Sequence, residues 1–445
     1  MIFIFWIIFF SFFAQSIFWY LHLFSSFKWL KNSRFFEDKK LEKGIIVLIP
    51  VLDEMKRLPE TLKYFLNEFK ELNLKIAIIT TEKERGLKNK SRLDTIEFSR
   101  RMSLVNPRVL HYHYPSASGK MAHQLNYGIK KLSEEVNLGS AFLAVYNADS
   151  RPHAKTFDWV LGMASKNKKI QVFQQYGDYT KNLHVFNNFF QKSILTSVAL
   201  QQTQWSIGAE IFRALKQFKE KNSKNIFKAP FNHCIGHGLI FTKNIFDQVG
   251  GFSEESHNED AIFGLKLSYF GETIMPIPFF DLSDTPDRVG SLIQQRKNWY
   301  FGPMQAFYYY KEIIKEDVGG KINKKRLYIL CCKLFRNAIN WALGPFFCFV
   351  SLMIVIFNFS KILLSAFIIE IFCYLVLPEL IVYFYIIKNN PRKIQDKKIN
   401  IIFFVIFGSI FNYFLYGLSA YWAIFEYARH IFFKKDLKKE KTKMA

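Results

Sequence analysis

The sequence contains little cysteine. Only five cysteines occur among 445 residues, and their spacing matches neither a disulfide framework nor a metal site. All except Cys234 lie in or beside an apolar region near the C-terminus, at positions 331, 332, 348 and 373. We therefore interpret the cysteines as small apolar side chains in a reducing compartment, which argues against a disulfide-stabilised secreted protein.

Acidic residues are also scarce. The chain has 37 aspartates and glutamates against 61 lysines and arginines, which gives a formal net charge of +24. Such a balance is compatible with nucleic acid, anionic lipid or phosphate ligands. The basic residues, however, crowd beside the apolar segments, as the positive-inside rule expects of membrane proteins. This distribution favours membrane lipids and argues against nucleic acid as a partner.

Charge is absent from residues 1–24, which are dominated by phenylalanine, isoleucine and tryptophan. A helix of this length can cross the ~30 Å hydrocarbon core of a bilayer. The stretch lacks the positive n-region and the small-residue cleavage site of a signal peptide. We therefore predict an uncleaved transmembrane anchor at residues 1–27. The basic residues of 28–43 place the N-terminus outside and a domain at 28–330 in the cytoplasm.

A second apolar region, at residues 331–432, predicts three or four further spans. Two spans are predicted at 336–358 and 361–387. Residues 400–432 form either one span with an interfacial helix or a tight pair of short spans. The tail at 433–445 is basic, with six lysines and two acidic residues, so we place it inside. An inside tail requires an even number of crossings after the cytoplasmic domain, which favours the pair.

Between the apolar ends, short apolar runs alternate with helical patterns. Strands are predicted at residues 44–52, 74–79, 108–112, 141–150, 170–176 and 239–242. Strands that alternate with helices indicate a mostly parallel sheet with helices on both faces. Ligands of such sheets bind at the carboxyl ends of the strands. Residues 185–220 read as helical and apolar on one side, typical of a helix at the membrane surface or along an acceptor cleft.

One strand end carries oxygen ligands. The apolar run that begins at Ala141 stops at Asn147-Ala148-Asp149. A carboxylate with an amide two residues earlier can hold a divalent cation through oxygen atoms. The alternative is an ordinary turn after the strand, because asparagine and aspartate are common turn residues.

A second acidic segment opens a helix. Asn258 is a good N-cap, and Glu259 and Asp260 occupy the first turn, where the helix dipole favours negative charge. Capping is therefore a structural alternative to a catalytic role for this acidic pair.

Taken in order, five segments resemble the motifs of membrane-bound family-2 glycosyltransferases. They are residues 49–54, 119–128, 147–149, 258–260 and 295–299. They are similar, respectively, to the first-strand Asn-Glu pair, Gly-Lys…Leu-Asn-x-Gly, Asp-x-Asp, Thr-Glu-Asp and Gln-x-x-Arg-Trp. The resemblance implies a GT-A-type, Rossmann-like α/β domain flanked by transmembrane helices, and the branch that includes cellulose, chitin and hyaluronan synthases.

The resemblance also implies roles for individual residues. Asp260 is the expected general base, abstracting the acceptor proton opposite the leaving group, which gives inversion. A Mg²⁺ or Mn²⁺ ion is expected on Asp149 with help from Asn147. The nucleotide-sugar is expected to contact Pro50, Asp53, Glu54, Glu82, Lys120, Asn147 and Arg296. The acceptor is expected to contact Glu259, Gln295, Trp299 and His237. For Trp299 an interfacial anchor facing lipid is the alternative.

Three positions depart from the family pattern. Asn147 replaces an aspartate, which removes one negative charge from the metal site and lowers its expected affinity. Glu82 stands where the family has an aspartate that contacts the base. Asn298 replaces the arginine of the last motif, which is commonest in polymer-making members and so bears on processivity. These departures also allow a catalytically degenerate scaffold or transporter partner of a glycan-assembly system.

The histidines permit a metal-binding alternative. His111 and His113 share one face of a predicted strand, but no cysteine or carboxylate lies at zinc spacing nearby. His237 and His257 fit better as polar lining of the acceptor cleft. The sequence thus predicts an integral membrane protein, of the bacterial inner membrane type, that transfers a sugar to a glycan or a lipid-linked acceptor.

Overall fold

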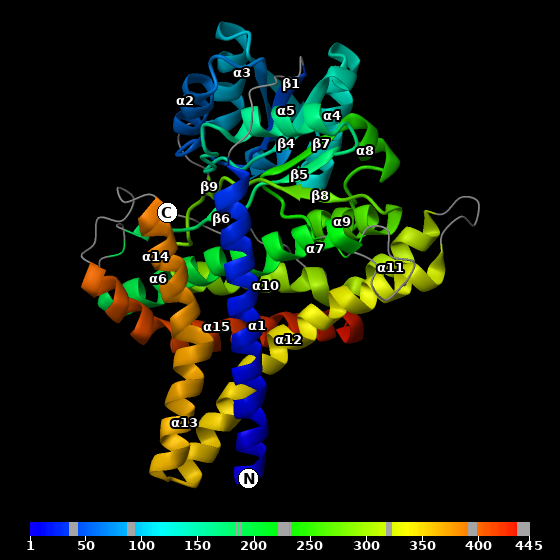
Figure 1. Ribbon diagram of the computed structural model, residues 1–445. Helices are drawn as coiled ribbons and strands as arrows, with labels where there is room; N and C mark the ends of the chain where they lie inside the picture. The colour runs from blue at the N-terminus through cyan, green and yellow to red at the C-terminus, as the bar shows by residue number, and fades with distance from the viewer. Residues whose placement is uncertain are drawn as a thin grey trace. The chain divides into compact units, whose positions relative to one another are not determined.

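The computed structural model describes residues 1–34, 43–86, 94–183, 186, 188–220, 231, 233–316, 323–389 and 398–433. Contacts divide the chain into two compact units, and both are discontinuous in sequence. The sheet unit comprises residues 29–177 and 213–283. The helical unit comprises residues 1–28, 178–212 and 284–445 (Figure 1). The predicted basic tail, from residue 434 onward, lies outside the described residues.

The sheet unit is built on seven strands in the order β3-β2-β1-β4-β7-β5-β8. Their bounds are β1 Gly44–Pro50, β2 Leu74–Thr81, β3 Val109–Tyr114, β4 Ala141–Val145, β5 Val172–Gln174, β7 Leu239–Thr242 and β8 Ile274–Pro276. Strand β7 runs antiparallel to both of its neighbours, and the other pairs are parallel. Two-residue strands occur at β6 Gly177–Asp178 and β9 Asp281–Leu282. The predicted mostly parallel α/β sheet is confirmed.

Helices cover both faces of this sheet (Figure 1). Alternate residues of β1 belong to two different hydrophobic clusters: Ile45 and Val47 to one, Ile46 and Leu48 to the other. The first cluster includes residues of α2 (Leu58–Glu68) and α5 (Thr156–Lys166). The second includes residues of α4 (Met121–Glu135), α8 (Lys243–Gln248) and α9 (Glu259–Phe270). Because successive strand residues point to opposite faces, an uninterrupted apolar run is what a strand buried on both faces requires.

The helices of the sheet unit follow the predicted alternation. They are α2 Leu58–Glu68, α3 Thr95–Val105, α4 Met121–Glu135, α5 Thr156–Lys166, α7 Phe212–Glu220, α8 Lys243–Gln248 and α9 Glu259–Phe270, with short 3₁₀ turns at Glu82–Gly86 and Leu138–Ser140. Helix α7 begins in the last residue of the helical unit's 178–212 segment.

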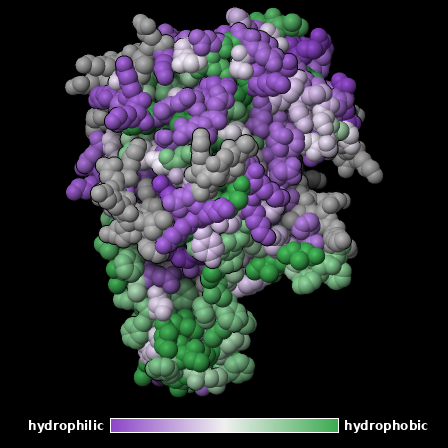
Figure 2. Space-filling model, turned by 90° about the vertical axis from the view of Figure 1, so that its right-hand side faces the viewer, coloured by the Kyte–Doolittle hydropathy of each residue, from purple (hydrophilic) through white to green (hydrophobic). Residues whose placement is uncertain are grey.

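The helical unit contains the long apolar helices. Its helices are α1 Ile2–Ser33, α6 Phe189–Trp205, α10 Val289–Met304, α11 Ala306–Lys315, α12 Lys324–Phe357, α13 Lys361–Ile371, α14 Leu377–Asn389 and α15 Lys398–Phe433, with π-helical turns at Ser206–Ile211 and Phe372–Val376. Four described segments are long and apolar enough to cross a membrane: Ile2–Ser33, Lys324–Phe357, Lys361–Asn389 and Asn400–Phe433. They suggest an integral membrane protein, and hydrophobic side chains cover the part of this unit that α1, α12 and α13 form (Figure 2).

The prediction of two short spans within residues 400–432 is wrong. This stretch lies in one uninterrupted helix, α15, which in Figure 1 runs across the directions of α1 and α13. Gly417, near its middle, makes no turn. A Cβ atom there would lie 2.6 Å from Cβ of Pro345, so the glycine permits close packing of α15 against α12.

Candidate functional site

The carboxyl ends of β1, β2 and β4 meet at one edge of the sheet. The register pairs Pro50 with Ile79 and Leu48 with Val145, so the segments that follow these strands are neighbours. This edge therefore brings together the predicted donor-site residues of three separate motifs. They are Pro50, Asp53, Glu54, Glu82, Asn147 and Asp149.

The loop after β1 is held by a carboxylate that the sequence analysis missed. Asp53 has φ 52°, the single positive value at a non-glycine position among the described residues. Its N–H donates to Oε2 of Glu84 at 3.0 Å, and the N–H of Thr95 donates to Oε1 of the same side chain at 3.0 Å. Glu84 is only 2% exposed. Glu82 and Glu84 both follow β2. The sequence does not indicate that Glu84 is the buried side chain that supports the loop and that Glu82 is half-buried. Conformations such as that of Asp53 cluster at ligand-binding loops.

Glu82, the predicted base contact, is linked to the two strand histidines. Its Oε2 lies 2.8 Å from Nε2 of His113. The Thr80 hydroxyl lies 2.9 Å from Nδ1 of His113 and 2.8 Å from Nε2 of His111. Burial, with the nearby positive charges of His113 and Arg100, lowers the pKa of His111 to about 4. In the described part of the chain no three His, Cys, Asp or Glu side chains are arranged to hold a metal ion.

Hydrogen bonds hold the turn after β4 in place. The predicted metal ligands in this turn are half-buried. Asn147 and Ser150 exchange hydrogen bonds of 3.2 Å in each direction. The Thr61 hydroxyl donates to the carbonyl of Ala148. Arg151 donates from Nη1 to Thr61 at 2.6 Å and to the Ser150 carbonyl at 2.8 Å. The segment is thus both a turn, as the alternative held, and a rigid platform for the side chains of residues 147 and 149.

A buried histidine–aspartate pair lies behind this turn. Asp281 is fully buried, accepts the Arg151 N–H at 2.7 Å, and has Oδ2 3.2 Å from Nδ1 of His237. Burial opposes protonation of His237, but the hydrogen bond and charge of Asp281, reinforced by Asp149 and Asp260, raise the pKa of the imidazole. Asp149, of the predicted metal motif, and Asp260, the predicted base, therefore both contribute negative charge at His237. Asp281 and Arg151 carried no sequence signal, because their partners lie far away along the chain.

Glycines bring His237 to this place. Gly238 has φ 68°, and a Cβ atom there would lie 2.5 Å from the carbonyl oxygen of Gln175. Its N–H donates to the carbonyl of Val145, the last residue of β4, at 2.7 Å. At Gly236 a Cβ atom would lie 3.3 Å from Oδ2 of Asp260, so the missing side chain leaves room beside the predicted base.

Helix α9 begins at Glu259 with Asn258 in the N-cap position, as predicted. Asn258 occupies the N-cap position, yet its side chain accepts no hydrogen bond from the first turn. Asp260 is half-buried and accepts the N–H of Ala261 at 2.8 Å, whereas Glu259 is 3% exposed. The geometry thus leaves Asp260 as the more accessible of the two carboxylates.

The Gly-Lys motif supports the loop that leads to Asp260. Lys120 donates from Nζ to the carbonyls of Glu255 and Ser256, at 2.8 and 3.4 Å. Asn126 of the same motif donates to the carbonyl of Phe252 at 2.8 Å and accepts its N–H at 3.1 Å. Lys120 therefore positions the segment before α9 in this structure, and its contact with a diphosphate stays a prediction.

The last motif lies in the helical unit, on α10. Arg296 is 1% exposed and donates from Nη2 to Asn412 at 2.7 Å and to Gln201 at 2.9 Å. Burial lowers the pKa of its guanidinium to about 10. Gln295 is buried, and Trp299 is 38% exposed. The donor and acceptor contacts predicted for these three residues stay predictions.

The donor set at the β4 turn fits one kind of metal ion. Asp149 and Asn147 offer a carboxylate and an amide, both oxygen donors. Mg²⁺ is typically bound through one or two carboxylates together with substrate phosphates and water. The two side chains therefore fit a hard divalent cation that arrives with a diphosphate, and they do not form a complete cage by themselves.

Comparisons with known proteins found a family model that matches part of the chain, and solved structures that are similar to it. Residues 193–387 match the family described as Glycosyl transferase family group 2. The chain matches no curated protein. Among solved structures, the mannosyltransferase PcManGT from Pyrobaculum calidifontis, in complex with GDP-Man and Mn²⁺, is 13% identical with a TM-score of 0.48, covering 96% of this chain and 99% of that one. TarS residues 1–349 from S. aureus, in complex with UDP-GlcNAc, are 9% identical with a TM-score of 0.37, covering 85% and 92%.

Proposed function

We propose that the chain is a family-2 glycosyltransferase, as the match of residues 193–387 supports, and that it transfers a sugar, with inversion, from a nucleotide-diphosphate sugar to a glycan or lipid-linked acceptor. The transfer takes place at the cytoplasmic face of the membrane that its apolar helices span. The observation that carries the proposal is the path of the glycine loop: the Gly238 N–H donates to the carbonyl at the end of β4 at 2.7 Å, and a Cβ atom at Gly236 would lie 3.3 Å from Oδ2 of Asp260, so this loop joins the strand before Asp149 to the predicted base.

The β1 and β4 loops form the donor end of the site. The strained loop at Asp53, fixed by Glu84, and the turn at 147–149 face the place where a nucleoside diphosphate binds in parallel α/β sheets. Asp149 and Asn147 would hold a divalent cation, which supplies positive charge to the leaving diphosphate. Their rigid support from Thr61 and Arg151 pre-organises these ligands and avoids rearrangement during the reaction.

Asp260 is the acceptor-side residue. Its half-buried carboxylate, next to the space left by Gly236, accepts the proton of the acceptor hydroxyl. The oxygen then forms the new bond to the anomeric carbon as the bond to the diphosphate breaks on the opposite face, which inverts the configuration. Although burial opposes protonation, the hydrogen bond and charge of Asp281 raise the pKa of His237, which favours a positive charge on the imidazole in this part of the sheet unit.

The test uses the full-length protein in detergent with a panel of nucleotide-sugars. Nucleoside diphosphate release is measured with and without a divalent cation. Asp260→Asn is expected to reduce release by about 10²–10⁴-fold, because it removes the proton acceptor. Asp149→Ala is expected to abolish the response to added cation.

The matched control is Asp247→Asn, an exposed carboxylate paired with Lys243. It should leave release unchanged. If release, and the transfer of label to any acceptor, survive both active-site substitutions, the enzymatic role is wrong and the scaffold alternative gains support. If activity persists after complete chelation, the proposed role of the cation is wrong, but the proposed transferase activity stands.

A further inference from the structure

A buried carboxyl group in the helical unit has no part in the proposed chemistry. Glu370 lies on α13, within the segment Lys361–Asn389 that is long and apolar enough to cross a membrane. It is 2% exposed, and neither of its carboxyl oxygens has a hydrogen-bond partner among the described residues. Ionisable side chains inside such segments are rare, and they usually mark positions with a chemical function.

Glu370 lies deep within this apolar segment. It follows Lys361 by nine residues, which corresponds to about 14 Å along a helix. That distance is nearly half of the ~30 Å hydrocarbon core of a bilayer. The preceding residues Ile368 and Ile369 are 57% and 47% exposed. The helix therefore presents an apolar face outward and the carboxyl group inward.

The surroundings of Glu370 are hydrophobic. Cys348 of α12 lies close enough to interact with it electrostatically. Cys348 belongs to a buried cluster that also contains Phe12 of α1 and Phe367 of α13. Ser351 of α12 is fully buried as well, and its hydroxyl group has no hydrogen-bond partner in the described part of the chain. This hydroxyl therefore does not satisfy the carboxyl group.

The sequence supplies no cation for this carboxyl group within the apolar segments of α1, α12, α13 and α14. Residues 1–27, 337–360 and 362–387 contain no lysine or arginine. A carboxylate ion that is buried without a counter-charge or hydrogen bonds is much less stable than the neutral acid. These surroundings therefore favour the neutral acid over the ion.

A second glutamate of the same segment provides a contrast. Glu379 is also 2% exposed, but its two carboxyl oxygens accept hydrogen bonds from the hydroxyl groups of Ser197 and Ser409, at 2.9 and 3.0 Å. The positive charge of Arg296 also acts on it. The two glutamates are thus alike in burial and opposite in their partners.

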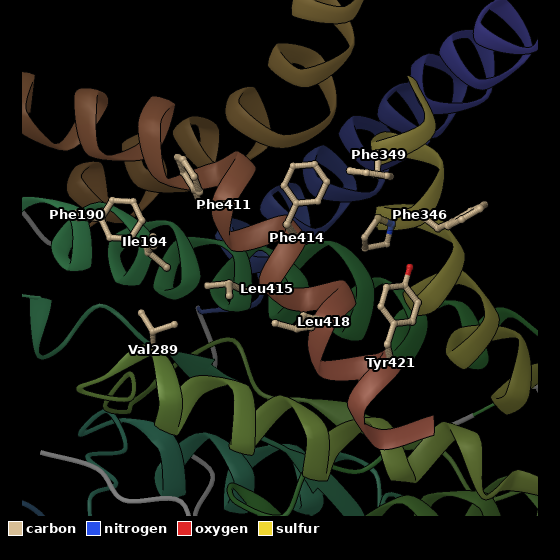
Figure 3. A pocket seen from close by; sticks show the side chains of 11 residues that line it. Phe190, Ile194, Val289, Phe346, Phe349, Phe411, Phe414, Leu415, Leu418 and Tyr421 are labelled. Atoms are coloured by element: carbon tan, nitrogen blue, oxygen red, sulfur yellow. The ribbon is translucent and has the colours of Figure 1, made fainter. Parts of the chain in front are cut away.

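The large cavity of the helical unit does not provide a ligand for Glu370. This cavity of about 480 Å³ is lined by apolar side chains of α6, α10, α12 and α15, among them Phe346 and Phe414 (Figure 3). Glu370 is not one of the lining residues. A reagent for this carboxyl group therefore has to reach it from the bilayer.

We propose that Glu370 is a buried carboxylic acid and the site at which a bilayer-soluble carbodiimide attaches covalently to this protein. The acid proton moves to one carbodiimide nitrogen, and the carboxyl oxygen adds to the central carbon. The acyl group of this O-acylisourea then migrates from the oxygen to the unprotonated nitrogen, which leaves a stable N-acylurea. The reagent is added whole, so no other reactant is needed.

Two properties of the site favour this reaction at Glu370. The first step needs a proton on the carboxyl group, and carboxylates that water solvates as ions lack that proton at neutral pH. The second step competes with hydrolysis of the O-acylisourea, and the apolar core of a bilayer contains almost no water. Glu379 shares the burial, but its oxygens are already engaged by two hydroxyl groups.

The first experiment uses the unmodified full-length protein in isolated membranes at neutral pH. The membranes are treated with dicyclohexylcarbodiimide, and fragment ions in mass spectrometry locate the adduct. Glu370 should gain the mass of one whole reagent about tenfold more often than Glu379, because breaking one hydrogen bond costs about a factor of ten in rate. No adduct on Glu370, or equal modification of the two glutamates, would overturn the proposal.

A water-soluble carbodiimide with glycine methyl ester as nucleophile is the matched reagent control. It should modify exposed carboxyl groups such as that of Glu71, whose side chain is 82% exposed, and leave Glu370 unmodified. Modification of Glu370 by this reagent would show that water reaches the site, which contradicts the proposal.

Substitutions test the unpartnered acid without any reagent, through thermal unfolding in detergent. Glu370→Gln should change the melting temperature little, because a neutral amide replaces a neutral acid of similar size. Glu370→Leu should raise it by a few degrees, because a buried polar group without partners is removed. Glu379→Leu is the matched control and should lower it, because Ser197 and Ser409 lose their acceptor. An equal fall for both leucine variants would show that Glu370 has partners and would refute its assignment.

Discussion

The two units each contain a buried charged cluster, and the clusters leave different groups accessible. In the sheet unit, Asp281 is completely buried, but it supports a turn and a histidine beside the half-buried carboxylates of Asp149 and Asp260. In the helical unit, Arg296 and Glu379 are both buried, and each is bonded to side chains of neighbouring helices. The first arrangement leaves two carboxylates half-exposed, whereas the second joins helices. A motif residue therefore has to be judged by its partners as well as by its place in the motif.

Removing the guanidinium of Arg296 is the strongest test of this contrast. Arg296→Leu leaves Oδ1 of the buried Asn412 without this donor, at a cost of about 1–3 kcal/mol, and removes one of two donors to the half-buried Gln201. We expect a large drop in thermal stability in detergent, with nucleotide binding retained by the fraction that stays folded.

The control for this prediction is Arg429→Leu, an exposed arginine of α15, which should change stability little. A variant at Arg296 with normal stability but lost nucleotide affinity would reverse the interpretation and support the predicted diphosphate contact.

Glu84→Gln tests the support of the donor loop. The substitution removes the charge that accepts the N–H groups of Asp53 and Thr95, and it weakens two hydrogen bonds of 3.0 Å. A loss of about 1.4 kcal/mol would raise the KM for the nucleotide-sugar about tenfold, with kcat less affected. Steady-state kinetics measure this split. Glu60→Gln, on α2, is the comparison, and an equal KM change there would remove the special role of Glu84.

The His237–Asp281 pair predicts a dependence of stability on pH. The pKa of His237 is raised above its ordinary value of 6.5, because Asp281, Asp149 and Asp260 together outweigh burial. The pair's stabilisation is therefore fully present below pH 6.5 and is lost as the pH rises through the raised pKa. Thermal unfolding midpoints from pH 5.5 to 9 should fall more steeply for the unmodified protein than for His237→Gln.

His153→Gln, at an exposed position, is the control for this pH profile. It should keep the slope of the unmodified protein. Parallel profiles for the unmodified protein and His237→Gln would show that the imidazole stays neutral in the folded state.

The smallest expected effect concerns the space beside Asp260. Gly236→Ala places a Cβ atom 3.3 Å from Oδ2 of that carboxylate, so a shift of a few tenths of an ångström is required. We expect a several-fold fall in kcat with little change in stability, because the backbone at this position does not require glycine. Gly86→Ala, where no atom lies within 4 Å of the added Cβ, should have no effect on kcat. Equal rates for both variants would argue against a tight fit around Asp260.

Much of the fold followed from local patterns. Apolar runs such as 44–52 and 239–242 predict buried strands because both faces of the sheet are covered. The positions of the motifs directly after predicted strands also placed Asp53, Asn147 and Asp149 correctly at one edge of the sheet. Locally encoded features of this kind need no knowledge of distant partners.

Features that depend on distant partners were missed. Asp281 meets Arg151 across 130 residues, and Arg296 meets Asn412 across 116. No local pattern encodes such pairs. The same limit applies to α15, where the space for Gly417 depends on Pro345 of another helix. Glu82 was predicted from the family resemblance, and Glu84 was not singled out because its burial is a tertiary property.

The pairing of α6 with α15 has a consequence for synthesis of the chain. Phe189 and Phe190 of α6 pack against Phe404, Phe407 and Phe411 of α15. Helix α6 ends at Trp205, but α15 begins only at Lys398. At about 5–20 residues per second, the ribosome needs roughly 10–40 s to cover that interval. Throughout this time the apolar face of α6 lacks its native partner, so a membrane or a chaperone has to shield it until the last helix emerges.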